Sequence, residues 1–212
     1  SIEICEKRYK YAKKINVDGI KYIVKKIIKR NKRIIYLSSS AVFSGSKAFY
    51  EESDYRKPLN NYGKFKREIE NYIKINAKDY AVLRISKLDL TLVPLLNKWY
   101  DKLKNNIKIH PIPNKYLSPV PILKTLEAID ILINKKYAGF FHLSSSDEID
   151  YIKVAKILIQ SFSFKYSLLL INNNHINNKY HDFTTLKNSH IFKKILRIKS
   201  NAVIEQLIIQ YL

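Results

Sequence analysis

The order of apolar segments in the first 85 residues constrains the fold more than any other feature of this sequence. Residues 7–30 carry apolar side chains at three- and four-residue spacing, which predicts a helix. Short apolar runs at 33–38 and 80–85 predict buried strands, separated by a loop over 44–61 and a helix over 62–77. Because two strands joined through a helix pair in parallel, we expect an α/β fold.

The second half of the chain contains shorter elements and several prolines. We expect helices over 91–104, 121–134, 151–164 and 201–212. We expect strands over 107–110, 140–143 and 167–171, and an Asn-rich loop over 172–178.

The formal net charge of +21 raises the question of a nucleic-acid partner. Of the 39 basic residues, 32 are lysines, and they are dispersed along the chain. Arginine, the residue that binds phosphate or guanine through two hydrogen bonds at once, occurs only 7 times. Lysine shares A/T-rich codons with isoleucine and asparagine, which are also abundant. We therefore attribute the charge to codon composition and expect no nucleic-acid partner.

Several other classes of protein are disfavoured by composition. Apolar residues make up 46% of the chain, enough for a buried core. Cys5 is the single cysteine and the five histidines lack metal-ligand spacing, so we expect neither disulfides nor a metal site. No apolar run reaches about 18 residues and no signal-peptide pattern opens the sequence, so we expect no membrane span and a cytoplasmic location.

Three serines, Ser38, Ser39 and Ser40, follow the first predicted strand directly. Parallel sheets bind ligands at the carboxyl ends of their strands, where hydroxyl groups can donate to a substrate carbonyl. A serine-rich turn without a ligand is the alternative interpretation, and this observation by itself favours it.

Tyr62 and Lys66 lie four residues apart and therefore share a face of the predicted helix. An ammonium group beside a phenol lowers the phenol's pKa and makes it suitable for proton transfer. The spacing alone is weak evidence, since Tyr9–Lys13, Tyr22–Lys26 and Tyr100–Lys104 repeat it. Only Tyr62 follows a strand-end serine run and begins a helix after a loop.

An ordered set of motifs extends this pattern over nearly the whole chain. They are LSSSAVFSG at 37–45, EESDYRKPLNNYGKFKRE at 51–68, YAVLRIS at 80–86, NVDGI at 16–20, KYLSPVPIL at 115–123 and GFFHL at 139–143. Together they resemble the extended short-chain dehydrogenases/reductases, and within them the dTDP-4-dehydrorhamnose reductase branch. The resemblance implies a Rossmann-like parallel sheet with a small C-terminal α/β lobe. Residues 1–90 would be the C-terminal part of the dinucleotide-binding domain. Residues 91–212 would be mostly a substrate-binding lobe, with segments returning to the sheet.

The resemblance also implies a role for each matching residue. Ser39 takes the position of the serine that polarises the substrate carbonyl, and Tyr62 that of the proton donor. Lys66 takes the position that binds the nicotinamide ribose and lowers the tyrosine's pKa. Ser38 and Ser86 are expected beside an NADP or NAD cofactor, and Ser40 and Lys87 beside a sugar nucleotide.

The implied reaction is reduction of a keto-sugar nucleotide by NAD(P)H, in deoxysugar or polysaccharide biosynthesis. An NDP-sugar epimerase or dehydratase and a non-catalytic regulatory protein that binds the same ligands remain alternatives. The family pattern allows a homodimer.

Three departures from the family pattern bear on this expectation. Phe65 replaces a small residue, and Lys87 stands where the reductase branch carries an aromatic side chain. The four glycines form no G-x-G-x-x-G, the loop that holds the cofactor's pyrophosphate. We therefore expect the chain to be the C-terminal part of a longer, active protein, and to be inactive alone.

Overall fold

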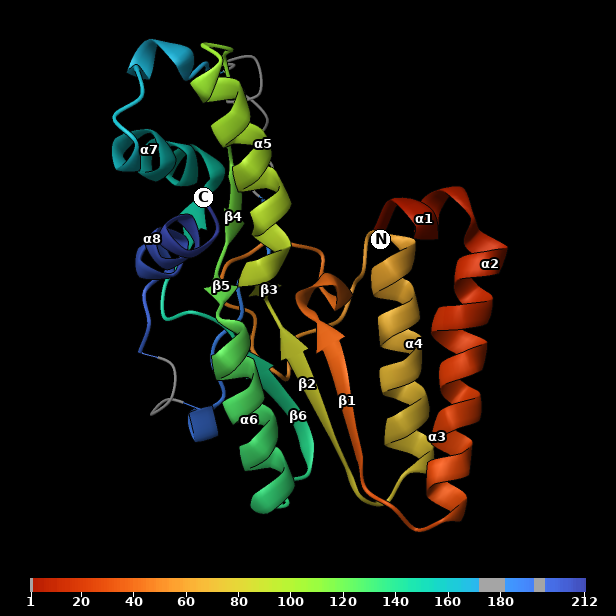
Figure 1. The fold of residues 1–212 in the computed structure, drawn as a ribbon. Helices are drawn as coiled ribbons and strands as arrows, with labels where there is room; N and C mark the ends of the chain where they lie inside the picture. The colour runs from red at the N-terminus through yellow and green to blue at the C-terminus, as the bar shows by residue number, and fades with distance from the viewer. Residues whose placement is uncertain (1, 172–181, 193–196) are drawn as a thin grey trace.

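The structure is a computed structural model that describes residues 2–171, 182–192 and 197–212. At its centre lies a parallel sheet in the order β1 (Ile34–Ser39), β2 (Tyr80–Ile85) and β6 (Gly139–Leu143) (Figure 1). Ser39 of β1 is paired with Ile85, which is paired in turn with Leu143, so the three carboxyl ends lie in register. The predicted α/β fold with parallel strands is confirmed.

Helices cover both faces of this sheet (Figure 1). On one side lie α3 (Ile20–Lys29) and α4 (Asn61–Asn76), which pack with Val82. On the other side lies α6 (Ile122–Asn134), which packs with the next residue of β2, Leu83. Successive side chains of a strand point to opposite faces, so β2 contributes to both cores and is buried almost throughout.

The helix predicted over 7–30 begins earlier and is divided into four parts. They are α1 (Ile2–Lys7), α2 (Tyr9–Lys13), a π-helical segment at Lys14–Gly19, and α3. Asn16 donates its side-chain amide to the Ala12 carbonyl at 2.9 Å, and so competes with the backbone inside the widened turn.

A second lobe contains three helices around their own core (Figure 1). They are α5 (Val93–Lys104), α7 (Tyr151–Ser161) and α8 (Ser200–Tyr211). Short strands border them: β4 (Lys115–Leu117) pairs with β7 (Ile149–Asp150) and β8 (Asp182–Phe183), and β3 (Lys87–Leu88) pairs with β5 (Pro119–Val120). Trp99 is buried in this core, as expected of a packing residue.

Two predicted strands in the second half are wrong. Residues 107–110 and 167–171 meet only at an isolated bridge between Ile109 and Leu169, and Tyr166–Leu168 forms a 3₁₀ turn. Two prolines follow directly at 111 and 113, and proline cannot donate to a ladder, so the pairing stops there. The Asn-rich loop predicted over 172–178 lies outside the described residues.

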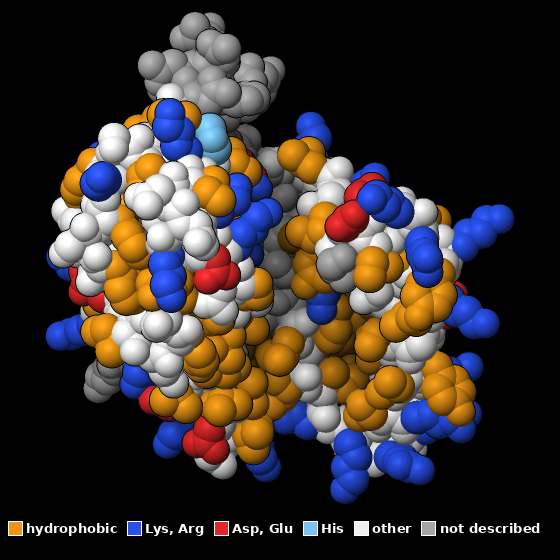
Figure 2. Space-filling model, turned by 45° about the horizontal axis from the view of Figure 1, so that its top comes forward, with side chains coloured by type: hydrophobic (Ala, Val, Ile, Leu, Met, Phe, Trp, Pro, Cys, Tyr) orange, Lys and Arg blue, Asp and Glu red, His pale blue; other side chains and the backbone are white. Residues whose placement is uncertain are grey.

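Basic side chains are spread over both lobes of the face seen in Figure 2. No helix among the described residues combines the length and apolar character needed to cross a membrane. Within the same ranges, His, Cys, Asp and Glu residues form no group of three or more arranged to hold a metal ion.

Candidate functional site

A cavity of about 790 Å³ opens at the carboxyl ends of β1 and β2. Its walls include all seven residues to which the resemblance assigns a role: Ser38, Ser39, Ser40, Tyr62, Lys66, Ser86 and Lys87. Segments distant in the sequence complete it, namely Lys115 of β4 and the stretch 182–184 around β8. The sequence therefore identified one side of this cavity, and the fold brings the other side to it.

The three serines at the end of β1 make different hydrogen bonds. Ser38 is buried and donates to the carboxylate of Glu70 at 2.6 Å, while Ser40 donates to the backbone carbonyl of Ser86 at 3.1 Å. Ser39 Oγ accepts from the Ala41 amide at 3.2 Å, and its side chain is also hydrogen-bonded to the Tyr62 phenol. Of the three hydroxyls, that of Ser39 is therefore the one linked to the predicted proton donor.

Tyr62 stands in the first turn of α4, close to this serine turn. Asn60 caps the helix by accepting from the Gly63 amide at 2.8 Å, which fixes where the helix begins. A Cβ on Gly63 would lie 2.0 Å from the Ala41 carbonyl oxygen, so only glycine allows the helix to approach so closely. This contact brings the Tyr62 phenol next to Ser39.

The pKa of the Tyr62 phenol is raised, because burial disfavours the phenolate, and a hydrogen bond with Ser39 opposes part of that rise. The sequence had predicted a lowered value. Lys66 Nζ lies 5.7 Å from the centre of the Tyr62 ring. In this structure, then, burial is the largest influence on the pKa of Tyr62, and it disfavours the phenolate.

Lys66 projects from the next turn of α4 toward the end of β1. Its ammonium donates to the Leu37 carbonyl at 2.9 Å and lies 4.8 Å from the centre of the Tyr36 ring. Burial lowers the pKa of Lys66, and the charge of Glu70, one turn further along, opposes that shift. The lysine is thus positioned by the strand as well as by its helix.

Ser86 and Lys87 continue the chain from the end of β2 into the opposite wall. Ser86 is buried, and its hydroxyl donates to the Ser118 carbonyl. Burial and then the neighbouring charge of Lys115 lower the pKa of Lys87. Lys115 itself pairs with Asp182 at 3.1 Å. Two lysines therefore stand at this end of the cavity.

Glu70 is the residue of this region that the sequence did not reveal. It is fully buried on α4, accepts from Ser38, and binds Arg84 through two hydrogen bonds of 3.0 and 2.9 Å and Arg56 through one of 2.8 Å. A glutamate in a charged helical stretch normally faces solvent. Its position one turn after Lys66 was the only available signal.

The other polar residues considered from the sequence have structural surroundings. His142 is completely buried, contacts Arg84 at 3.1 Å, and lies 3.0 Å from the Tyr50 carbonyl, which confirms it as a core residue. Cys5 is buried among apolar side chains. Glu51 pairs with Lys187 and Asp54 with Lys47, so these two acidic side chains are matched by lysines.

The parallel sheet, the helices on its two faces and the cavity at its carboxyl edge define a Rossmann-like α/β protein of the extended short-chain dehydrogenase/reductase class. A family model described as the RmlD substrate binding domain matches residues 1–179, and the chain belongs to that family. The resemblance drawn from the sequence motifs is confirmed.

The chain is similar to several proteins of known name. Methionine adenosyltransferase 2 subunit beta from Bos taurus is 37% identical over 86 residues, covering 41% of this chain and 26% of that protein. A dTDP-4-dehydrorhamnose reductase from Aggregatibacter actinomycetemcomitans is 33% identical over 87 residues, covering 41% of this chain and 30% of that protein. These matches span about a quarter to a third of the relatives' own lengths.

The crystal structure of dTDP-4-dehydrorhamnose reductase from Bacillus anthracis, in complex with NADP, superimposes with a TM-score of 0.80. The match covers 98% of this chain and 76% of that one, at 18% sequence identity. At this identity the similarity establishes a shared fold.

Proposed function

We propose that this chain supplies the catalytic and substrate-facing part of a reductase that acts on a keto-sugar nucleotide. The observation that carries the proposal is the convergence of Ser39, Tyr62 and Lys66 on one cavity at the carboxyl edge of the sheet. The relative from Aggregatibacter, named for a reductase of this kind, supports the substrate class.

The side chains support this chemistry through their hydrogen bonds and protonation states. Ser39 exchanges its hydrogen bond with Tyr62 for one to the keto oxygen and so polarises the carbonyl. Tyr62 then gives its proton to the same oxygen as negative charge develops there, completing the alcohol. Burial raises the pKa of the Tyr62 phenol, which favours the protonated donor but disfavours the phenolate left behind, and the nearby Lys66 ammonium would stabilise that phenolate.

The residues present fit the nicotinamide end of a dinucleotide, because a lysine ammonium and a phenol share one wall of the cavity. Lys66 would hold the ribose hydroxyls, and Ser38 and Ser86 would border the ring. When bound, NADP or NAD in its reduced form supplies the hydride that the carbonyl carbon accepts. Ser40 and Lys87, with Lys115 nearby, would face the sugar nucleotide.

Tyr62→Phe tests the proposal in the natural protein. The variant should lose about 10²- to 10⁴-fold in kcat for NADPH oxidation with dTDP-4-dehydrorhamnose, because it removes the general acid. Tyr22→Phe is a matched control, since Lys26 lies 5.3 Å from the Tyr22 ring at the same sequence spacing but on the exposed surface. Full activity of Tyr62→Phe would exclude this role.

A second candidate is a non-catalytic subunit that binds the same ligands. The similarity to methionine adenosyltransferase 2 subunit beta favours it. In that case the wild-type protein would be stabilised by NADPH in a thermal-shift measurement without consuming it. An epimerase or dehydratase would convert the sugar nucleotide without net consumption of NADPH, so product analysis separates all three.

A further inference from the structure

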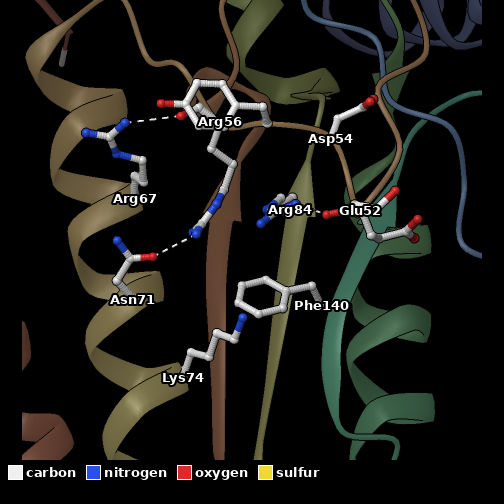
Figure 3. A pocket seen from close by; sticks show the side chains of 10 residues that line it. Glu52, Asp54, Arg56, Arg67, Asn71, Lys74, Arg84 and Phe140 are labelled. Atoms are coloured by element: carbon white, nitrogen blue, oxygen red, sulfur yellow. Dashed lines mark hydrogen bonds between the residues drawn. The ribbon is translucent and has the colours of Figure 1, made fainter.

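A second cavity, of about 430 Å³, lies between α4 and the loop that precedes it, away from the candidate active site. Arg67, Asn71 and Lys74 reach it from successive turns of α4, and Arg56 reaches it from the loop (Figure 3). Arg84 and Phe140 form its floor on the sheet. Its residues contribute nothing to the proposed reduction, so its role is a separate question.

Some of the basic side chains of this cavity are paired with a carboxylate and others are not. Arg56 donates to Glu70 at 2.8 Å and to Asn71 at 2.7 Å, and Arg84 is paired with Glu70 as well. Arg67 donates one hydrogen bond, of 3.1 Å, to the Arg56 carbonyl. Among the described residues, no salt bridge includes Arg67 or Lys74, so these two cations face the cavity without a carboxylate.

The two acidic residues of the cavity are engaged by other groups. Asp54 binds Lys47 at 2.8 Å, and Glu52 accepts from the Ser189 hydroxyl. Figure 3 shows both on the opposite side of the cavity from Asn71 and Lys74. An anion between Arg67 and Lys74 would therefore lie apart from these carboxylates.

The ring of Phe140 on the cavity floor is already in contact with two arginines. The guanidinium groups of Arg84 and Arg56 lie 4.8 and 5.8 Å from the centre of its ring, and so compete with a ligand for contact with that ring. The cavity offers a ligand the exposed ring of Tyr55 and several hydrogen-bond donors, namely the remaining N–H groups of Arg67, the ammonium of Lys74 and the amide of Asn71.

We propose that this cavity binds the phosphate group of a small phosphorylated molecule. A guanidinium and an ammonium on one helix face are donors that suit phosphate oxygens. The volume exceeds that of a phosphate ion, which leaves room for an attached organic group. The ligand is bound through its phosphate, and Arg56, already fixed by Glu70, forms the rigid side of the site.

Isothermal titration calorimetry of the natural protein tests this, with inorganic phosphate and ribose 5-phosphate as the two probes. Both should bind with 1:1 stoichiometry, and tighter binding of the ester would identify an esterified ligand rather than free phosphate. The Arg67→Gln/Lys74→Gln variant should bind at least tenfold more weakly. Affinity should also fall as the pH drops below about 6, where the phosphate loses its second charge.

Two control variants keep the proposal falsifiable. Lys25→Gln/Lys64→Gln removes the same charge from exposed positions outside the cavity and should leave binding unchanged. Lys87→Gln changes the candidate active site and should also leave it unchanged. Absence of saturable binding, an equal loss in the surface variant, or a loss in Lys87→Gln would each overturn the proposal. None of these results depends on reductase activity.

Discussion

Glu70 is the single residue of α4 that links the end of β1 to two arginines. One carboxylate binds the hydroxyl of Ser38, at the end of β1, and the guanidinium groups of Arg84 and Arg56. Two of these partners are themselves buried. A buried charge is tolerated only with such partners, so the buried carboxylate of Glu70 and the buried guanidinium of Arg84 depend on each other.

Glu70→Gln should therefore destabilise the protein by about 3–5 kcal/mol, because it leaves two guanidinium groups without their counter-charge. Glu68→Gln, two residues earlier on the same helix, breaks only the half-exposed pair with Lys21 and should cost about 1 kcal/mol or less. Urea denaturation of both variants measures the difference. Equal losses would show that Glu70 contributes no more than a surface charge.

Among the elements, α4 and the turn after β1 are in direct backbone contact, because Gly63 has no side chain to keep them apart. The serine turn was predicted from the sequence, but its contact with the start of α4, which Asn60 caps, was not. Sequence spacing predicts which face a residue occupies, whereas the approach of two backbones depends on tertiary packing.

Gly63→Ala should destabilise the protein by several kcal/mol and displace Tyr62 from Ser39, since the new Cβ would meet the Ala41 oxygen at 2.0 Å. Gly19→Ala is the control. Its Cβ would meet the Lys14 oxygen at an ordinary 3.5 Å, and alanine should be neutral or stabilising by up to about 1 kcal/mol. Thermal unfolding of the two variants gives the comparison, and a stable Gly63→Ala would contradict the close contact.

Across the whole molecule, the elements that could be predicted from the sequence are those whose pattern lies within one short segment. The strands β1, β2 and β6 were predicted almost to the residue because each is a short apolar run. The strands β4 and β5 were missed because the prolines around them favour a loop, and they form only by pairing with distant segments. The far wall of the candidate site, from Lys115 to 182–184, was missed for the same reason.

Global stability should depend on pH through His142, which joins β6 to Arg84 and to the loop at Tyr50. Burial, and then the charge of Arg84, lowers the pKa of His142 to about 4. The unfolded chain, with a histidine pKa near 6.5, binds this proton first, so stability is complete above about pH 6.5 and falls as the pH approaches 4. The loss attributable to this group is about 3 kcal/mol.

Denaturation of the wild type between pH 7 and 4 should show this slope, and His142→Gln should reduce it even if the variant is less stable throughout. His110→Gln changes an exposed histidine and should keep the wild-type slope. A slope unchanged in His142→Gln would assign the pH dependence to other groups.

The π-helical turn at Lys14–Gly19 determines where the first helices can gain or lose a residue. A π-helical turn accommodates more residues than an α-helical one. Deleting one residue there would convert the wide turn to an ordinary α-helical one, whereas deleting one residue from α3 would rotate everything before it by about 100° around the helix axis, since an α-helix has 3.6 residues per turn. Cys5 and Ala12, now buried in the core that contains Phe65 of α4, would turn away from it. The wide turn is therefore where this region can lose a residue and keep Cys5 and Ala12 buried, whereas the same change in α3 would detach the first helices from the helix that carries Tyr62.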